Sequence, residues 1–480
     1  MANNVDNHHP DYDVRVEEWA LMRDAARGET AVKQADTTYL PMPSGFTKRI
    51  DKGVALYGAY QMRAQFPEIV GPTIGGMVGV IHRVEIQVEM PTAMDPLWEK
   101  ATADGMPLEA LAAKITGEIL TTGRYALLAS APSAGGEPYI STYCTEALIN
   151  WSEARDFYVL DESGLVRDGF DWVEDKQYRV LELVDGKYQV TVYTGDTLAA
   201  GDPLIPTAKG GKPLEEIPLV VVGPRDLSPS PETPPLIGVA RAAVNMYQLS
   251  ADYRWQLFMT GQETLFIINA DEPEMVGAGV VVSLKADSEQ TPDAKYVGPA
   301  GVGIDAHKVA ITDERDAAAA AGAKLFDTAS QAQESGDARR LRFAAQTATL
   351  VTIAQASSKA LEQVLRHIAI MKGLDPTKVI VKPNLSFIDS TLTPAEVVQV
   401  IQGWQDGGYS YETMYERLQK GEAVNADRTA EEERKLIDEE DAASAASQEE
   451  LGILPVPAVP GPAPKPGDPA NPVPQPVPVA

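Results

Sequence analysis

The stretch that decides the fold is "PLIGVARAAVNMYQLSADYRWQLFMT", residues 235–260. Beyond Pro235 its only helix breaker is Gly238, and at ~1.5 Å per residue it predicts a rod of roughly 39 Å. Thr233 is expected to cap this helix, the prolines fit its first turn, and Gly261 fits its end. Because the apolar residues are spread around the circumference, we expect the helix to pack against more than one neighbour.

Two further long helices follow, separated from the first by a short β-rich insert. The runs "ETLFIINA" (263–270) and "GVVVSLKA" (279–286) are typical of strands, and "AKYVGPAGVGI" (294–304) leads into the second helix, predicted over 305–331. The third helix is predicted over 338–373. The order of helix, small β insert and helix predicts an antiparallel helix pair with the insert at one end.

An arginine cluster lies at the break between the second and third predicted helices. Arg339, Arg340 and Arg342 fall within four positions, just after a Ser-Gly break. Arginine near the N-terminus of a helix is unfavourable for the helix dipole, so a negative group is expected nearby. Two readings remain open: the arginines pair on the helix surface with acids such as Glu334 and Asp337, or they meet a passing phosphate.

The part of the chain before residue 233 reads as an α+β unit with antiparallel pairing. Helices are predicted over 13–28 and 107–123, ended by Gly28 and Gly123. Asp185-Gly186 marks a hairpin. The predicted strands are "RYALLAS" (124–130), "EPYISTYC" (137–144), "DFYVLDE" (156–162), "QYRVLELVDGKYQVTVYTG" (177–195, the hairpin) and "IPLVVVG" (217–223).

The C-terminal part is predicted to be mostly helical. "KVIVKPNLSFID" (378–389) reads as a strand, and two helices joined at Gly407-Gly408 are predicted over 393–421. A charged helix is predicted over 429–450. The segment from Pro455 to Ala480 has 11 prolines in 26 residues, so we expect it to be extended and disordered.

Composition excludes several classes of function. The 480 residues carry 41 basic and 69 acidic side chains, a formal charge of −28, which argues against general binding of nucleic acid. The single cysteine, Cys144, cannot form an intramolecular disulfide and is expected to be a small buried side chain, which fits a reducing compartment. We find neither a signal peptide nor a run of ~18 apolar residues, and expect no membrane partner.

No enzyme motif is present, so no catalytic residue, metal ligand or cofactor is predicted. Phosphate loops, dinucleotide fingerprints, zinc-protease motifs and nucleophile elbows are all missing. The glycine-rich "GPTIGGMVG" (71–79) lacks the lysine of a phosphate loop, and we interpret it as a close-packed turn. The five histidines are scattered, and the acidic runs are typical of solvated helix faces.

The order of segments over residues 10–440 resembles the portal proteins of tailed bacteriophages and prophages. It is most similar to the branch catalogued as a phage domain of unknown function. The pieces that carry the resemblance are "WALMRDAARGETAVKQADTTYLPMP" (19–43), "STYCTEALINW" (141–151), the first long helix with its following strand (235–267), "YVGPAGVGI" (296–304), "DERDAAAAAGAKLF" (313–326) and "GWQDGGYSYETMYERLQKGEAV" (403–424).

The resemblance implies a portal-like α+β fold: a mixed α/β wing, long antiparallel stem helices with a small β clip, and a helical crown. In this family a tunnel loop joins the second stem helix to the long wing helix, so the resemblance implies that Arg339, Arg340 and Arg342 face DNA phosphates. The implied division is 1–232 wing, 233–261 first stem helix, 262–304 clip, 305–333 second stem helix, 334–393 tunnel loop with wing helix and strand, 394–450 crown, and 451–480 a disordered proline-rich tail.

The same resemblance implies a function and a set of partners. The chain would form a ring, usually of twelve copies, at one capsid vertex, and double-stranded DNA would pass through its channel during packaging and ejection. Terminase, the major capsid protein and a head–tail adaptor would be its protein partners. It would reside in the virion, after assembly in the host cytoplasm. Another virion structural protein, such as a head–tail adaptor, and an enzyme with an unrecognised site remain as alternatives.

Overall fold

The computed structural model divides the chain into two compact units, residues 1–387 and 388–480. The described residues are 4–48, 52–132, 136–195, 197–261, 264–269, 291–298, 303–322, 336–385, 394–421, 423–425 and 428–450. The fold is α+β, as the sequence predicts, and the named strands pair only in antiparallel fashion. Among these residues, no helix combines the length and apolarity needed to span a membrane.

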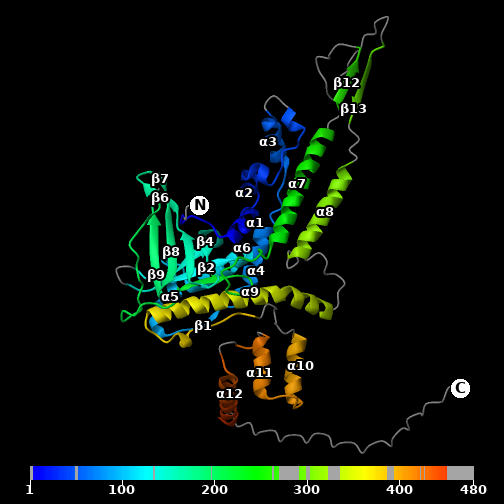
Figure 1. Cartoon of the computed structure of the whole chain (residues 1–480). Coiled ribbons are helices and arrows are strands. Elements are labelled where there is room, and N and C mark those ends of the chain that lie inside the picture. The colour runs from blue at the N-terminus through cyan, green and yellow to red at the C-terminus, as the bar shows by residue number, and fades with distance from the viewer. Residues whose placement is uncertain are drawn as a thin grey trace, which may run out of the picture. The chain divides into compact units, whose positions relative to one another are not determined.

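The first unit begins with several helices, seen in Figure 1, and a three-stranded sheet whose strand β2 packs against α6. The sheet has the order β11-β2-β3. The predicted end of one helix at Gly123 is confirmed, because this glycine has φ +74° and closes α6 in a left-handed cap. The elements are α1 (Pro10–Arg27), α2 (Glu29–Gln34), α3 (Val54–Arg63), α4 (Val70–Ile81), α5 (Pro96–Glu99), α6 (Leu108–Thr122), β2 (Tyr125–Ser130), β3 (Tyr139–Cys144) and β11 (Leu219–Val222).

A five-stranded sheet lies next in the chain, with a hairpin where the sequence predicts one. Its order is β10-β9-β8-β5-β4. Asp185 and Gly186 both have positive φ, +50° and +70°, as a tight two-residue hairpin turn requires. A separate two-stranded sheet, β6-β7, lies between β5 and β8 in the chain. The strands are β4 (Leu148–Trp151), β5 (Phe157–Asp161), β6 (Gly164–Asp168), β7 (Asp171–Asp175), β8 (Gln177–Val184), β9 (Lys187–Thr194) and β10 (Ala199–Ala200).

The predicted sequence of helix, β insert and helix is confirmed for the described residues. The elements are α7 (Ile237–Thr260), β12 (Thr264–Ile268), β13 (Asp293–Val297) and α8 (Ile304–Ala321). β12 pairs with β13, whereas the expected strand over 279–286 lies outside the described residues. The predicted cap at Thr233 is wrong, since α7 is preceded by Leu236 without a side-chain cap. Residues that precede prolines are driven towards extended backbone, which delays the start of the helix.

α9 (Gly336–Met371) is the longest helix of the first unit, and it crosses beneath both sheets in Figure 1. It packs against α6, β2, β11 and β14 (Ile380–Lys382). β14 pairs with β1 (Gln87–Glu89), which joins two segments far apart in the sequence. Among the side chains of α9 that the structure describes, which are those from residue 348 onward, the buried ones run from Leu350 to Met371. The main core therefore includes the C-terminal part of this helix, from Leu350 to Met371.

The described residues of the second unit form three helices. They are α10 (Pro394–Gln405), α11 (Tyr411–Lys420) and α12 (Ala430–Glu450). The first two are joined at Gly407-Gly408, and Gly407 has φ +80°, so the predicted link is confirmed. Trp404 and Tyr411 meet edge to face, with ring centroids 5.7 Å apart, which holds α10 against α11. The predicted proline-rich tail lies outside the described residues.

The glycine-rich stretch 71–79 is a helix, so its interpretation as a turn is wrong. It forms most of α4, which buries Val70, Thr73, Met77 and Ile81 on one face. A Cβ atom at Gly71 would lie 2.7 Å from the carbonyl oxygen of Ala26, so this glycine lets α4 approach α1. Burial of the apolar face outweighs the low helix propensity of glycine.

Candidate assembly and DNA-contact surfaces

α7 and α8 lie side by side in opposite directions. A Cβ atom at Gly238 would lie 3.1 Å from the Cβ of Ala321, and one at Gly303 would lie 3.0 Å from the side chain of Gln256. Between these points the side-chain amide of Asn245 donates a 3.3 Å hydrogen bond to Glu314. The order of these contacts along the two helices establishes the predicted antiparallel pair, and small residues at both ends bring the helices close together.

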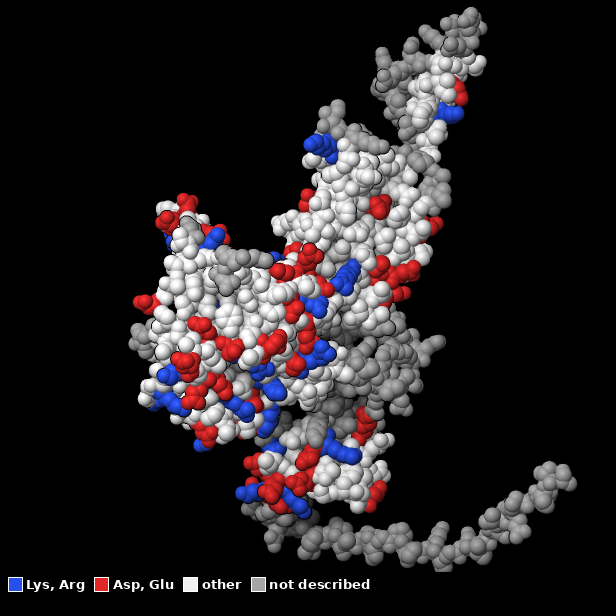
Figure 2. All heavy atoms as spheres, in the orientation of Figure 1, with Lys and Arg blue, Asp and Glu red and all other residues white. Residues whose placement is uncertain are grey.

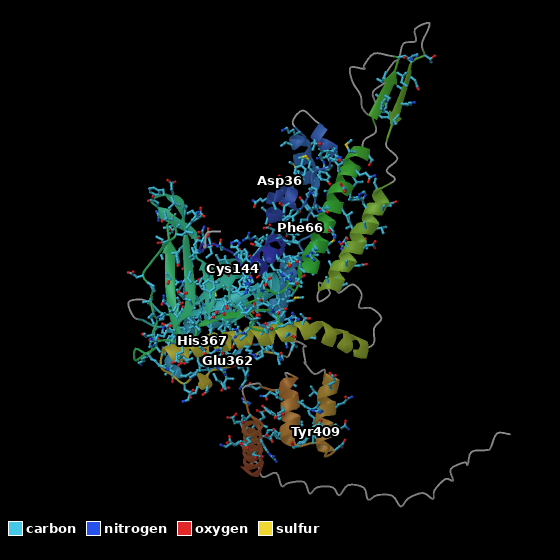
Figure 3. All side chains as sticks on the ribbon, viewed as in Figure 1. Asp36, Phe66, Cys144, Glu362, His367 and Tyr409 are labelled. Atoms are coloured by element: carbon cyan, nitrogen blue, oxygen red, sulfur yellow. The ribbon has the colours of Figure 1, made fainter. Side chains whose placement is uncertain are left out.

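The other side of α7 is attached to the N-terminal helices of the first unit. The Tyr60 hydroxyl on α3 donates a 2.6 Å hydrogen bond to Asp252, and the Ser250 hydroxyl accepts one of 3.0 Å from the backbone of Gln65. Phe66 and Tyr247 pack edge to face with ring centroids 6.0 Å apart, and Phe66 is labelled beside α7 in Figure 3. α7 therefore has neighbours on more than one side, which confirms the expectation drawn from its apolar pattern.

α8 presents most of its surface to solvent. Only Ala318 is buried along this helix, and Val309 is well exposed. A helix that covers one neighbour and leaves the rest of its circumference open is poorly stabilised in isolation, since most helix stability comes from tertiary packing. The outer face of α8 is therefore available for a further contact.

The β12–β13 hairpin carries apolar side chains that nothing in the described chain covers. Phe266 is 49% exposed and Tyr296 is 56% exposed, and Ile268 and Val297 are also exposed. Two strands do not form a hydrophobic core by themselves and are marginally stable in water. In sequence the hairpin falls between the C-terminus of α7 and the N-terminus of α8, so it is at one end of the antiparallel pair.

The arginine cluster lies at the N-terminus of α9. The helix begins at Gly336, which places the backbone of Arg339, Arg340 and Arg342 in its first two turns. α8 ends at Ala321, earlier than the sequence predicts, and the intervening residues 323–335 lie outside the described residues. The structure therefore fixes the helical position of the three arginines, whereas their contact with DNA stays a prediction.

Polar contacts fix the opposite end of α9. The Glu362 carboxylate accepts a 2.9 Å hydrogen bond from the backbone of Val381 on β14 and forms a 2.8 Å ion pair with Arg366. Burial lowers the pKa of His367, which is labelled near Glu362 in Figure 3. This end of the helix is thus held firmly against the core, and the orientation of the arginine-bearing end follows from it.

Charged groups near Cys144 form a structural network. The Arg23 guanidinium lies between Glu118, at 2.6 Å, and Glu146, at 2.9 Å, and it lines a hollow beside the cysteine. Burial raises the pKa of the Cys144 thiol, so the reactive thiolate is disfavoured. The cysteine is half-buried, which corrects the expectation of a fully buried side chain.

The described histidine, cysteine and carboxylate side chains form no metal-binding cluster elsewhere. Among the described residues, no group of three or more His, Cys, Asp and Glu side chains could hold a metal ion. One surface that the sequence analysis missed is the β6–β7 hairpin. Its signal was the pair Asp168-Gly169 between two short runs that contain apolar residues, because a glycine at this point favours a tight hairpin turn.

Comparison with known proteins finds one family match. Residues 235–370 match the model described as domain of unknown function DUF4055. This range runs from the residues just before α7 through α8 and nearly all of α9. It therefore coincides with the helix pair, the hairpin and the arginine-bearing helix. No curated protein matches the chain.

Three solved structures are similar to this chain at low sequence identity. The neck of an empty GTA particle, computed with C6 symmetry, has 15% identity and a TM-score of 0.39, and the match covers 72% of this chain and 88% of that one. The virion of a native gene transfer agent particle has 16% identity, a TM-score of 0.38 and coverages of 71% and 85%. The neck of a native GTA particle, computed with C12 symmetry, has 16% identity, a TM-score of 0.38 and coverages of 74% and 91%.

Proposed function

We propose that this chain is the portal protein of a tailed bacteriophage or prophage. Twelve copies form a ring at one vertex of the capsid. Double-stranded DNA passes through the central channel during packaging and ejection. The protein acts through assembly and surface charge, so the proposal includes no enzymatic activity and no cofactor.

One observation carries the proposal: the arrangement of α7, the β12–β13 hairpin, α8 and α9. An antiparallel helix pair with a hairpin at one end corresponds to the stem and clip of portal proteins, which the sequence resembles. The helix that follows begins at Gly336 and carries Arg339, Arg340 and Arg342 in its first two turns, next to the place where that resemblance implies a tunnel loop. α9 then enters the core of the first unit, and it lies where that resemblance implies the long wing helix.

Exposed apolar side chains support a role in assembly. The exposed side chains of the β12–β13 hairpin and the open face of α8 are features that a neighbouring copy would cover. A ring also needs each copy to offer two different surfaces, because rotation about an axis brings unlike faces together.

The charge of the chain supports a channel for DNA. A formal charge of −28 on each copy makes the assembled surface repel phosphate, which lets DNA slide rather than adhere. Three arginines at a narrow point would attract the phosphates locally, repeated once per copy. Terminase, the major capsid protein and a head–tail adaptor are the partners in this proposal, and the virion is the location, after assembly in the host cytoplasm.

Negative-stain microscopy of the purified full chain, together with mass measurement of the particle, tests the proposal. We expect rings with a central hole and a mass that is twelve times the 51.6 kDa of one chain. Compact monomers at every concentration would refute the portal role. Such monomers would favour the alternatives, which are a different virion protein or an enzyme with an unrecognised site.

A further inference from the structure

The β6–β7 hairpin is an exposed arm of the first unit. Every residue of both strands is exposed, and the side chain of Phe170 at its tip is 98% exposed. Leu165 and Trp172, at 66% and 64%, are exposed along its length. Such a two-stranded arm with open apolar side chains gains little stability by itself, so a surface that covers it is expected.

Several hydrogen bonds hold the base of this arm, although its tip is open. Backbone hydrogen bonding continues from β5 and β8 into the arm, since the amide of Glu162 donates to the carbonyl of Gln177 at 2.8 Å. The Glu162 carboxylate also accepts hydrogen bonds from Arg179, at 2.8 Å, and Tyr143, at 2.6 Å. A fixed base presents the tip in a defined orientation, which reduces the entropy lost on docking.

The arm is acidic as well as apolar. Residues 164–175 contain four carboxylates and one guanidinium, and none of these carboxylates forms an ion pair among the described residues. Asp168 and Asp171 flank the turn that holds Phe170. Figure 2 shows acidic side chains gathered at this end of the molecule. The tip therefore fits a partner surface that is apolar and basic.

One hollow of the same chain has this character. It lies between the C-terminal ends of α3 and α7, has a volume of about 440 Å³, and is lined by Met62, Arg63, Arg254, Leu257 and Phe258 among others. Met62 is 79% exposed and Phe258 is 49% exposed. We call this hollow the α3–α7 groove.

The two arginines of the groove are available to a partner. Arg63 stacks on Phe258, with its guanidinium carbon 3.9 Å from the ring centroid, and donates to the carbonyl of Ala59. Arg254 donates to the side-chain oxygen of Gln65. Neither forms an ion pair among the described residues, and Glu29, the carboxylate of the groove, is paired with Lys33 at 2.7 Å. The charge of Arg254 does help to lower the pKa of Glu29, but neither arginine is within ion-pair distance of a carboxylate among the described residues. The groove thus combines apolar side chains with two arginines that can accept a further negative partner.

We propose that the tip of the β6–β7 arm docks in the α3–α7 groove of a second copy of this chain. Phe170 fills the space between Met62 and Phe258, while Asp168 and Asp171 approach Arg63 and Arg254. Figure 1 shows the arm and α3 well separated within the first unit, so one chain cannot make this contact with itself. The contact joins unlike surfaces, which is the head-to-tail type that generates rings. The proposal rests on the proposed ring assembly and identifies one of its contacts.

A disulfide test examines the contact directly. In the full chain with Cys144→Ser, we would introduce Phe170→Cys and Met62→Cys together, and each alone as a control. Mild oxidation of the double variant should give a ladder of covalent dimers, trimers and larger species on a non-reducing gel, whereas the single variants should give no ladder. A double variant without a ladder would overturn the proposal.

Charge reversal provides a second test. Asp168→Arg with Asp171→Arg should raise the concentration at which half of the protein is assembled by at least about tenfold, which corresponds to about 1.4 kcal/mol. Arg63→Asp with Arg254→Asp should act in the same way, and combining the four changes should restore assembly. Glu17→Arg with Asp202→Arg, two exposed carboxylates elsewhere, is the matched control for net charge and should assemble normally.

The outcomes separate this contact from the portal role. A ladder without rings would support the docking contact and count against the portal. Rings that tolerate both charge reversals and give no ladder would support the portal and overturn the docking contact. If the variant Arg63→Asp with Arg254→Asp assembles normally but binds double-stranded DNA more weakly than the wild type, the α3–α7 groove is a DNA surface and the proposed contact is wrong.

Discussion

The guanidinium of Arg124 lies 4.4 Å from the ring centroid of Trp151, and the two residues are buried together in the core. The ring of Trp19 lies near the same guanidinium, at 5.3 Å. The guanidinium donates to the carbonyls of Thr145, Leu148 and Pro229 and to the Thr145 hydroxyl, at 2.7 to 3.0 Å. Burial lowers its pKa to about 9, so the group stays charged at neutral pH. Arg124 lies between α6 and β2, so these hydrogen bonds connect both elements to the segment 145–148 and to Pro229. No carboxylate is among its hydrogen-bond partners.

Replacing this arginine should destabilise the first unit. Arg124→Met removes the donors and leaves their acceptors buried and unpaired, so we expect the free energy of unfolding to fall by at least about 3 kcal/mol. Urea unfolding followed by tryptophan fluorescence measures the change, since Trp19 and Trp151 report on the site. The control Arg225→Met alters an exposed arginine and should have little effect. Equal stability of both variants would show that the buried contacts contribute nothing.

Acid should weaken the contact between β5 and β8 through Glu162. Burial alone would raise the pKa of this carboxyl, but hydrogen bonds and charge from Arg179, with hydrogen bonds from Tyr143 and Gln177, lower it below its usual value. A carboxyl with a lowered pKa in the folded state stabilises the fold fully above its unfolded pKa, about 4.3, and loses that contribution as pH falls through the folded pKa.

The lowered pKa of Glu162 determines how the stability of the variant Glu162→Gln should depend on pH. The variant should be less stable than the wild type at pH 7, and the difference should shrink as the pH falls below about 4.3. Urea unfolding midpoints at pH 7, 5, 4 and 3 measure the difference. Glu17→Gln, at an exposed position of α1, should show no such convergence. A difference in stability that stays constant down to pH 3 would show that the ionised Glu162 carboxylate does not stabilise the fold.

The close approach of α7 and α8 at Gly238 should not tolerate a large side chain. Gly238→Leu places atoms where a Cβ is already 3.1 Å from Ala321, so the helices should separate at this end. Hydrogen exchange is expected to accelerate along α8, which has little other packing. Gly58→Leu in α3 is a suitable control because a Cβ there meets nothing within 4 Å. Unchanged exchange in α8 would mean that the helix pair adapts without separating.

Removing the β12–β13 hairpin should abolish assembly but leave the fold intact. Gln256 near the end of α7 lies against Gly303 at the start of α8, so a short Gly-Ser linker can replace residues 265–300. The hairpin has no core of its own and is expected to complete its sheet with a neighbouring copy. We expect soluble protein with wild-type circular dichroism and no rings in negative stain. Rings as abundant as those of the wild type would remove the hairpin from the assembly contacts.

The arginine cluster should act on DNA and not on folding. Changing Arg339, Arg340 and Arg342 to glutamine should leave folding and ring formation normal, because exposed ion pairs contribute at most ~1 kcal/mol each. Phage heads built with this variant should form but package or retain DNA poorly, since phosphate attraction at the constriction is lost. Quantitative DNA content of purified heads measures the effect.

A matched variant separates charge from shape in that experiment. Lysine at the same three positions keeps the positive charge and should preserve most packaging. If the glutamine variant fails to fold, the arginines are structural partners of acids such as Glu334 and Asp337. Wild-type DNA content in the glutamine variant would exclude a channel role.

Local patterns in the sequence were sufficient for many of the elements. The uninterrupted run after Gly238 predicts α7, and the Asp185-Gly186 pair predicts the β8–β9 turn because few residues adopt two successive positive φ angles. Gly123 likewise predicts the end of α6. These features depend on neighbours in the chain, so they are visible without the fold.

Tertiary packing decided the rest. The stretch 71–79 is rich in glycine and reads as a turn, yet it is helical because Val70, Met77 and Ile81 are buried together and Gly71 lets α4 approach α1. No local pattern indicates that Arg124 is buried between two tryptophans, since its hydrogen-bond partners lie 21 or more positions away. The α3–α7 groove combines residues separated by about 190 positions, so only the folded chain brings its charges and apolar side chains together. Long-range contacts of this kind arise from burial, which a linear pattern does not encode.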